Sequence, residues 1–300
     1  MAALSAEDNR IEVAASGESP RRWWRSVAHS WEGRIGLAMG AVILLVVLVG
    51  PHIAPYSPTE NGVGPIGAGP SGSHWLGTDD LGRDVTSRVL AGGTLVLVIP
   101  LVANLFATLI GGGVAIWAVY IGGKSDKTVT GFFDVMLTLP PLLMVLVIIA
   151  GLGTSTAVLT GAITLFFIPR AGRVLRGAAQ AVVANDYIAA AQARGEGSWW
   201  LVRREILPNI AGPALADFAL RTTYAIIFVA TLSFLGLGVQ PPAPDWGAMV
   251  AQNRDLITTN PAAILGPIAA IVLLAVSLNL LADALSRHVS GAEDDEGVTL

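Results

Sequence analysis

The sequence contains no cysteine and few charged residues, and both shortages restrict what the protein does. Without cysteine there are no disulfides, no thiolate metal sites and no thiol nucleophile. Charged residues make up 13% of the 300 residues, about half the share of an ordinary soluble domain. None of the four histidines lies in the interior of a long apolar run. Since histidine is the usual base and metal ligand of buried chemistry, we expect no catalytic residue and no metal site there.

Hydrophobic residues are abundant instead, at 53% of the chain with a mean hydropathy of +0.63. A bilayer-spanning helix needs about 20 mostly apolar residues. Six apolar runs approach that length, the third interrupted by Pro140 and Pro141 and the short fourth closed by Pro169. They cover residues 35–53, 95–121, 132–151, 157–168, 213–237 and 262–285. We therefore predict an all-α integral membrane protein of about six transmembrane helices.

The basic residues are distributed unevenly between the loops. With the N-terminus placed in the cytoplasm, fourteen Lys and Arg residues fall on the cytoplasmic side and three on the outer side. The outer three are Arg83, Arg88 and Arg254. This asymmetry follows the positive-inside rule, so we expect both termini in the cytoplasm. The net charge of −4 indicates no nucleic-acid partner.

The chain divides into three parts by composition. Residues 1–34 form a cytoplasmic, partly disordered segment. Pro51 rather than a small-residue cleavage site stands at the end of the first span, so we expect an uncleaved anchor. Residues 35–289 form the transmembrane domain, which includes a cytoplasmic loop at residues 170–212. Residues 290–300 form an acidic tail with nothing to bury, which we expect to be disordered.

The loop at residues 170–212 has the pattern of a helical hairpin. An alanine-rich stretch from Arg173 to Ala193 favours a helix, and Gly195 can adopt the positive φ that ends one. Gly197 adds freedom, Ser198 is a candidate N-cap for the next helix, and Pro208 is expected to stop it. Small side chains, Ala189, Ala190 and Ala191, would face the cytoplasm beside the turn. From the residues alone, a surface for a protein partner and a helix lying on the membrane are equally good interpretations.

This segment resembles the cytoplasmic EAA loop of binding-protein-dependent ABC importer permeases. Ala190, Ala191, Gly195, Leu207 and Pro208 occupy the positions of that motif. Ala189 replaces the family's glutamate, and Glu205 replaces its usual histidine. In the family this loop docks on an ATPase subunit, which the resemblance therefore implies here.

Two further segments resemble the dipeptide, oligopeptide and nickel importer permeases. They are residues 74–88, after the first span, and residues 231–247, at the end of the fifth. The resemblance implies the type I ABC importer fold in the bacterial cytoplasmic membrane and a non-catalytic subunit that forms half of a pathway for short peptides. Nickel or another small solute is the alternative cargo. The implied partners are a second homologous permease subunit, an extracytoplasmic solute-binding protein, and two ATPase subunits that hold ATP and Mg.

Charged residues outside the hairpin give two more candidate sites. Asp217 and Arg221 lie four apart in the fifth span, where they form either an intrahelical ion pair or part of the substrate path. The charged stretch from Asp79 to Arg88, which we expect on the outer side, forms local salt bridges, an outer gate or a contact for the binding protein. Trp246 is either an interfacial anchor or part of the same contact. The candidate outer contacts are Asp79, Arg83, Asp84, Arg88 and Trp246.

Two other interpretations have weaker support in the sequence. The run Gly122-Gly-Lys-Ser125 suggests a phosphate-binding loop, but Ala118 stands where that motif requires glycine. ATP is therefore expected on other chains. An ion-coupled secondary transporter would need several ionisable groups inside the membrane, and only Asp217 and Arg221 are obvious.

Overall fold

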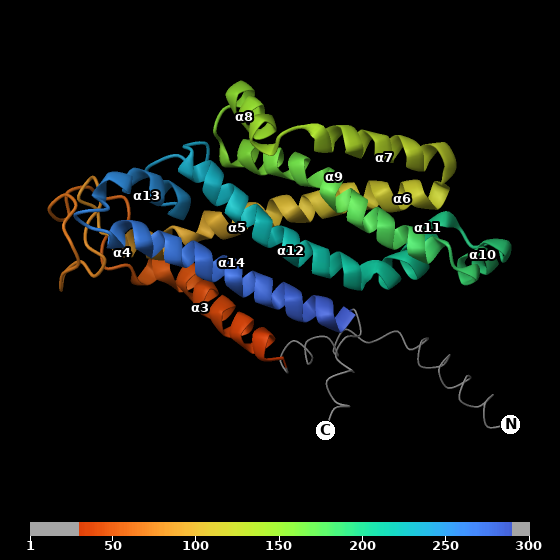
Figure 1. Cartoon of the computed structure of the whole chain (residues 1–300), viewed down its shortest axis with the longest axis horizontal. Helices are drawn as coiled ribbons and strands as arrows, with labels where there is room; N and C mark the ends of the chain where they lie inside the picture. Colours follow the sequence, from red (N-terminus) through yellow and green to blue (C-terminus); the bar gives the residue numbers. More distant parts are fainter. Residues whose placement is uncertain (1–29, 290–300) are drawn as a thin grey trace.

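The computed structural model describes residues 30–289, in which the longest helices run roughly along one axis of the molecule (Figure 1). Our expectations for residues 1–29 and 290–300 lie outside the described residues. Between residues 30 and 289 there is no β-strand, as predicted for an all-α protein. The helices are α3 (Trp31–Ile53), α4 (Val85–Ala91), α5 (Gly93–Ala107), the π-helix η1 (Thr108–Gly112), α6 (Gly113–Ile121), α7 (Gly123–Thr138), α8 (Pro141–Leu152), α9 (Thr156–Val183), α10 (Asp186–Ala193), α11 (Ser198–Leu201), the π-helix η2 (Val202–Ile206), α12 (Leu207–Phe234), α13 (Trp246–Gln252), the 3-10 helix η3 (Arg254–Leu256) and α14 (Ala262–Val289).

Five helical stretches in the described part are long and apolar enough to cross a bilayer, and a bent pair makes a sixth. The five are Trp31–Ile53, Val85–Ile121, Thr156–Val183, Ser198–Phe234 and Ala262–Ser286. The prediction of about six transmembrane helices is therefore confirmed. Large apolar side chains also cover the outside of the bundle, as a lipid-facing surface requires. They include Val42, Leu45, Leu48, Val135, Val147 and Val272.

The third crossing is not the single helix that we predicted. Helices α7 and α8 meet at an angle of 86°. Leu139 and Pro140 both adopt extended backbone conformations between them, because a residue that precedes proline is excluded from the helical region. The run 132–151 is therefore a broken span whose first helix already begins at Gly123.

The fourth crossing corrects a second prediction. Helix α9 continues through Pro169 to Val183, so Pro169 does not close a short span. The first part of the predicted loop, residues 170–183, forms the last turns of this helix. Neighbouring helices can accommodate a proline inside a span, and here α9 packs closely on η1. A Cβ atom at Gly111 would collide with the carbonyl oxygen of Ile168, so the two backbones are in direct contact.

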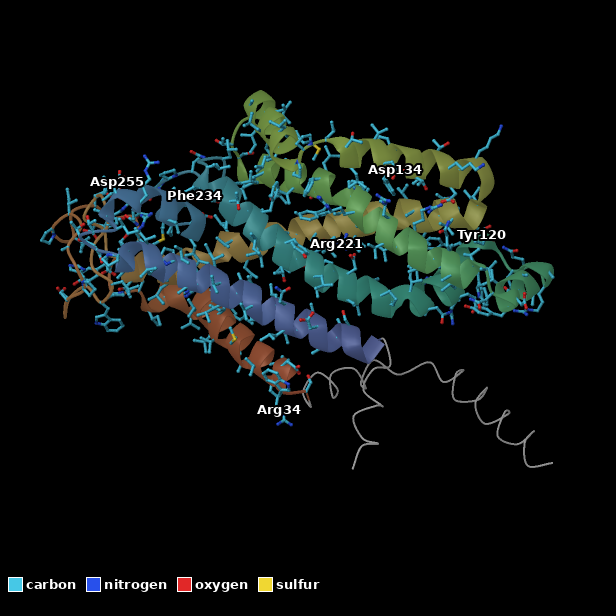
Figure 2. All side chains as sticks on the ribbon, in the orientation of Figure 1. Arg34, Tyr120, Asp134, Arg221, Phe234 and Asp255 are labelled. Atoms are coloured by element: carbon cyan, nitrogen blue, oxygen red, sulfur yellow. The ribbon has the colours of Figure 1, made fainter. Side chains whose placement is uncertain are left out.

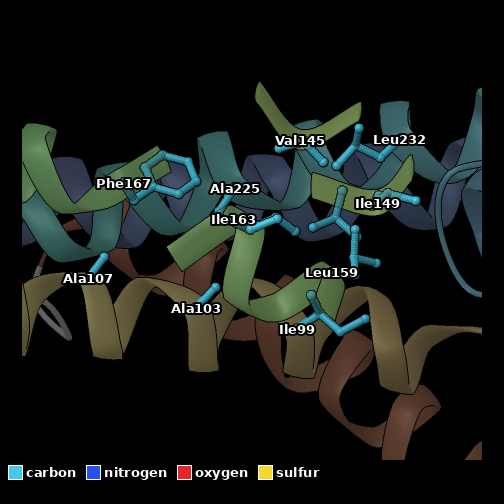
Figure 3. Close-up of a cluster of buried hydrophobic side chains, with 12 residues drawn as sticks. Ile99, Ala103, Ala107, Val145, Ile149, Leu159, Ile163, Phe167, Ala225 and Leu232 are labelled. Carbon is cyan, nitrogen blue, oxygen red and sulfur yellow. The ribbon is translucent and has the colours of Figure 1, made fainter. Parts of the chain in front are cut away.

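Three apolar clusters occur in the described residues, two of them in the bundle and the third beneath residues 186–206. The first joins α5, α8, α9 and α12 (Figure 3) and contains Ile99, Ala103, Ala107, Val145, Ile149, Leu159, Ala162, Ile163, Phe167, Ala225, Val229 and Leu232. The second surrounds Trp246 and joins α3, α4, α5, α12, α13 and α14. Helices α5 and α12 contribute to both clusters, so these two helices connect the two halves of the bundle.

Candidate functional site

The hairpin formed by α10 and α11 lies at one end of the molecule, opposite the end that carries α13 (Figure 1). Gly195 forms its turn with φ +85°, as predicted. Gly197 occupies the N-cap position of α11 without a side-chain cap. Ser198 is therefore the first residue of α11, and our prediction that it caps the helix is wrong.

The predicted small-residue face of the hairpin is only partly presented to the outside. Ala189 and Ala190 are exposed, whereas Ala191 is buried. Beside the turn, Trp199 is 65% exposed. The inner side of the hairpin packs on α6, α9 and α12 through Ile116, Val119, Leu175, Ala179, Ile188, Val202, Ile206 and Ile210. The hairpin thus has a fixed inner side and an outer side with small and aromatic residues available for contact.

The second helix of the hairpin is continuous with the fifth crossing. Residues Ser198–Phe234 form one helical stretch of 37 residues, made of α11, η2 and α12. Pro208 does not stop it, which corrects our prediction. Proline is compatible with the first turn of a helix, and Pro208 lies in the first turn of α12. Leu207 and Pro208 are exposed there, and Glu205 is half-buried.

A hydrogen bond joins Tyr187 of α10 to Asn209 in the first turn of α12. The hydroxyl of Tyr187 accepts a hydrogen bond from Asn209 Nδ2 at 3.4 Å. Partial burial raises the pKa of Tyr187, and the carboxylate of Glu205 raises it further. The phenol therefore stays protonated at neutral pH and can also donate a hydrogen bond.

Asp217 and Arg221 form the predicted ion pair, with 2.7 Å between Arg221 Nη2 and Asp217 Oδ2. The pair lines a cavity of about 710 Å³ between α7, α9 and α12. Arg221 lies between the two ends of the molecule (Figure 2). The other lining residues are Leu137, Phe166, Phe167, Arg170, Arg173, Val174, Tyr224, Ile227, Phe228 and Thr231. The two interpretations of this pair, an ion pair and a part of a path, are therefore compatible.

Two cavity arginines were not among the predicted site residues. Arg170 and Arg173 belong to α9, but the assumption that Pro169 ends the fourth span placed them in a cytoplasmic loop. Their spacing of three residues puts them on one helical face. The sequence indicates this shared face if the fourth helix is predicted to continue past Pro169.

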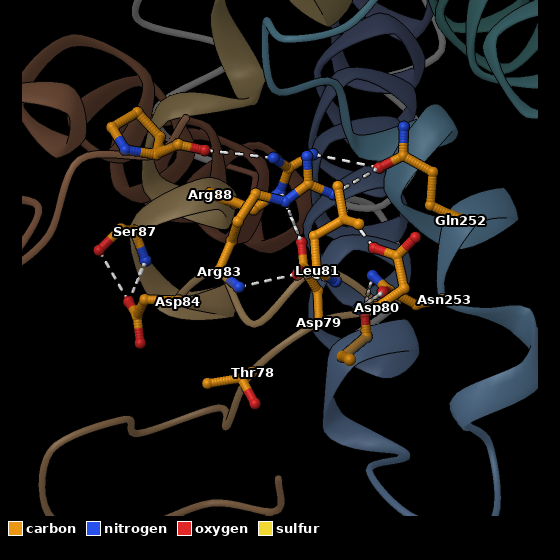
Figure 4. A network of polar contacts seen from close by, with 12 residues as sticks. Thr78, Asp79, Asp80, Leu81, Arg83, Asp84, Ser87, Arg88, Gln252 and Asn253 are labelled. Carbon is orange, nitrogen blue, oxygen red and sulfur yellow. Dashed lines mark hydrogen bonds and ion pairs between the residues drawn. The ribbon is translucent and has the colours of Figure 1, made fainter. Parts of the chain in front are cut away.

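A buried polar network organises the opposite end of the molecule (Figure 4). Arg83 Nε lies 2.6 Å from Asp79 Oδ2, and Arg88 Nε lies 3.4 Å from the same oxygen. Both arginines also donate to Gln252 Oε1 of α13, at 3.3 and 3.2 Å. Gln252 was not predicted, because it lies more than 160 residues along the chain from its partners.

This network corrects our predictions for the outer segment. Asp79, Arg83, Asp84 and Arg88 are at most 4% exposed, so their side chains do not face a partner and are not weak surface salt bridges. Trp246 is fully buried and donates from Nε1 to the carbonyl oxygen of Val89 at 2.8 Å, so it is not an interfacial anchor. These residues hold residues 54–84 against α13.

Asp84 is held by groups from its own segment. It accepts hydrogen bonds from the backbone nitrogen and the hydroxyl of Ser87, both at 2.7 Å, and lies 2.9 Å from His74 Nδ1. In a catalytic triad the histidine lies between the aspartate and the serine. Here the serine and the histidine both contact the aspartate, so the three residues do not form a triad. Among residues 30–289, no cluster of three potential metal ligands occurs.

Comparison with known proteins places these features in a family. The family described as "Binding-protein-dependent transport system inner membrane component" matches residues 103–291. The chain is 33% identical over 270 residues to the glutathione transport system permease protein GsiD of Pectobacterium atrosepticum, with 88% of each chain covered. It is 33% identical to the dipeptide transport system permease protein DppC of Alkalihalophilus pseudofirmus, over 84% of this chain and 83% of that one. It is 35% identical to the probable D,D-dipeptide transport system permease protein DdpC of Escherichia coli, over 81% and 82%.

The matched region includes the hairpin and every residue that lines the cavity. The chain therefore belongs to the family of inner membrane components of binding-protein-dependent transport systems, and is a multi-pass, non-catalytic permease subunit of the bacterial inner membrane.

Proposed function

We propose that this chain is the transmembrane subunit of an ATP-driven ABC importer and forms half of the pathway for short peptides. A second homologous permease subunit supplies the other half, and a solute-binding protein delivers the cargo. Two ATPase subunits bind ATP and Mg and dock on the hairpin. The observation that carries this proposal is the continuous helix Ser198–Phe234, which connects the hairpin directly to the cavity.

The continuous helix gives a physical route for coupling. At about 1.5 Å per residue it is roughly 55 Å long, and Asp217 and Arg221 lie near its middle. A displacement of the hairpin by a closing ATPase therefore moves the cavity wall with it. The membrane part then exchanges between inward-open and outward-open states, as in other two-state proteins biased by a ligand.

The orientation follows from the basic residues. The hairpin and both termini lie in the cytoplasm, where an ATPase is available, and the end with α13 faces outward. The buried network then has an indirect role in binding-protein contact. It holds residues 54–84 as one body, whose outer surface carries Ile66 and Trp75, each 70% exposed.

Short peptides are the proposed cargo because the relatives named above transport glutathione or dipeptides. The cavity supports this choice, since its volume of about 710 Å³ suits a small ligand. Nickel is less well supported, because residues 30–289 contain no cluster of metal ligands. Another small solute carried by the same machinery remains the second candidate.

The test is to purify the chain with its natural partners and measure ATP hydrolysis in proteoliposomes. The proposal expects an associated ATPase whose hydrolysis rate rises when binding protein and a dipeptide are both present. An assembly without an ATPase contradicts the proposal. Uptake that runs on an ion gradient without ATP contradicts it as well and favours a secondary transporter.

A further inference from the structure

The cavity between α9 and α12 has more positive than negative charge in its lining. Three arginines, Arg170, Arg173 and Arg221, line it together with a single carboxylate, Asp217. Asp134 lies outside the lining. Its Oδ1 is 3.7 Å from Arg173 Nη1, and the side chains of both residues are more than half exposed. Such an exposed pair compensates little charge.

Arg221 is the buried member of this group. It is 5% exposed, and its Nη2 is occupied by Asp217 and Thr108. Its Nε and Nη1 are buried without a hydrogen-bond partner among residues 30–289. A buried cation with two unmatched donors costs free energy unless an acceptor approaches. The pair with Asp217 is neutral overall, so Arg221 offers the cavity two unmatched N–H donors rather than a net charge.

Arg170 supplies an accessible cation in front of that wall. Its guanidinium carbon lies 4.0 Å from the centroid of the Phe166 ring, and the side chain is exposed. In the described part of the chain it has no carboxylate within salt-bridge distance. Stacking on Phe166 holds the planar group in place while its N–H groups remain free to bind a planar anion in two-point fashion.

Arg170 and Arg221 lie at a depth in the bundle where a charged side chain needs a polar partner. Arg170 lies about 14 residues, or roughly 21 Å, along α9 from Thr156, and Arg221 lies about 13 residues, or roughly 20 Å, from the end of α12 at Phe234. With Thr156 and Phe234 taken as the outer face of the membrane, both lie within a hydrocarbon core about 30 Å thick. Charges at such depth face a path or a partner rather than lipid.

The rest of the lining suits apolar groups. Phe166 stacks on Phe228 with 5.2 Å between ring centroids and meets Phe167 edge-on at 4.9 Å. Tyr224 continues this aromatic wall and is 68% exposed. A site with a cationic end and aromatic walls fits a small molecule that carries a carboxylate beside apolar side chains.

We propose that this cavity binds the C-terminal carboxylate of the transported peptide through Arg170 and Arg173, with the two unmatched N–H donors of Arg221 behind them. The inference rests on the proposed function and adds the chemical class of its substrate. Every linear peptide with a free C-terminus carries this carboxylate in ionised form at neutral pH. The site therefore selects for a free C-terminus while the aromatic wall accepts different side chains.

The test compares uptake of one apolar dipeptide with uptake of its C-terminal amide, using the intact assembly in phosphatidylcholine vesicles. The binding protein's own preference is the same in every assay, so it cancels when the acid-to-amide ratio of a variant is divided by that of the wild type. Replacing both Arg170 and Arg173 by Gln should lower this ratio about tenfold, the loss expected for one charge-assisted hydrogen bond. Arg170→Lys should retain most of the selectivity, because it keeps the charge.

Arg254→Gln is the matched control, since Arg254 is an exposed arginine outside the cavity, and its ratio should equal that of the wild type. Co-purification with the partners is measured first. If the double variant does not assemble, Arg173→Gln alone replaces it, because Arg173 is 58% exposed and tolerates change.

Three results separate the possible failures. Equal losses for acid and amide overturn the inference and assign the arginines to packing or to the second permease subunit. A change of ratio that occurs only when phosphatidylglycerol is present also overturns it, because an anionic lipid then occupies the site. Absence of ATP-dependent uptake of either peptide by the wild type contradicts the proposed function itself.

Discussion

Arg221 on α12 donates a hydrogen bond from Nη2 to the hydroxyl oxygen of Thr108 at 3.0 Å. Thr108 begins the π-helical turn η1 of the second crossing, so this contact joins two spans inside the bundle. The same nitrogen lies 2.7 Å from Asp217 Oδ2. This guanidinium thus joins the cavity wall to the neighbouring crossing, beside the hydrogen bonds that Asn104 Nδ2 donates to Phe218 O and Thr222 Oγ1.

Thr108→Val should weaken this junction without changing the size of the side chain. Hydrogen bonds between membrane helices contribute about 0.6–2 kcal/mol, so the free energy of unfolding should fall by that amount. Thermal unfolding of the purified chain in detergent measures it. Thr128→Val is the control, because Thr128 is exposed and donates only to the carbonyl of Lys124 in its own helix. Equal losses for the two variants would show that the contact with Arg221 adds nothing.

Asp217→Asn should destabilise the chain more than the double change Asp217→Asn with Arg221→Gln. The single change leaves Arg221 charged, buried and without its carboxylate, which costs about 3–5 kcal/mol in buried pairs. The double change removes both charges. Unfolding midpoints in a double-mutant cycle give the coupling between the two residues.

Arg221→Gln alone tests whether the pair also belongs to the substrate path. We expect uptake per assembled complex to fall, since a charge of the cavity is lost; the amount of assembled complex is measured beside it, because Asp217 is left without its partner. Uptake at the wild-type rate, with normal expression, would limit the pair to a structural role.

Gly195→Ala should destabilise the hairpin by about 1 kcal/mol, because Gly195 has φ +85° and L-residues avoid that conformation. Gly197→Ala is the conformational control, as Gly197 has φ −70°. Hydrogen exchange of the amides in α10 and α11 measures local opening. Faster exchange is expected in the Gly195 variant only, and equal exchange in both would exclude a conformational role for Gly195.

Asp79→Asn should loosen the outer segment. Asp79 is fully buried and faces both Arg83 and Arg88, so neutralising it leaves two buried cations with less compensation and costs about 3 kcal/mol or more. Limited proteolysis of residues 54–84 should become faster. Asp80→Asn is the matched change, because the Asp80 side chain is 37% exposed, and it should alter proteolysis little.

The sequence could predict features that depend on near neighbours. Apolar runs are local, so the number of crossings was correct. The spacing of Asp217 and Arg221 is one helical turn, so their ion pair was also predictable. Gly195 was identified as a turn because glycine is the residue that adopts positive φ without steric cost.

The errors came from features that depend on distant parts of the chain. Pro169 and Pro208 were interpreted as helix ends from their local chemistry, whereas the structure continues both helices. At Pro169 the close packing of α9 on Gly111 supports the helix from outside. The charges of residues 79–88 were interpreted as exposed because Gln252 and α13, which cover them, lie far along the chain.

Coupling between the hairpin and the cavity depends on the continuous helix Ser198–Phe234. The most direct test inserts two glycines between Ile206 and Leu207 and measures peptide uptake per ATP hydrolysed in the reconstituted assembly. We expect the ATPases still to co-purify and hydrolyse ATP, while uptake per ATP falls at least about tenfold because flexible glycines interrupt the rigid connection. Uptake per ATP equal to that of the wild type would contradict it.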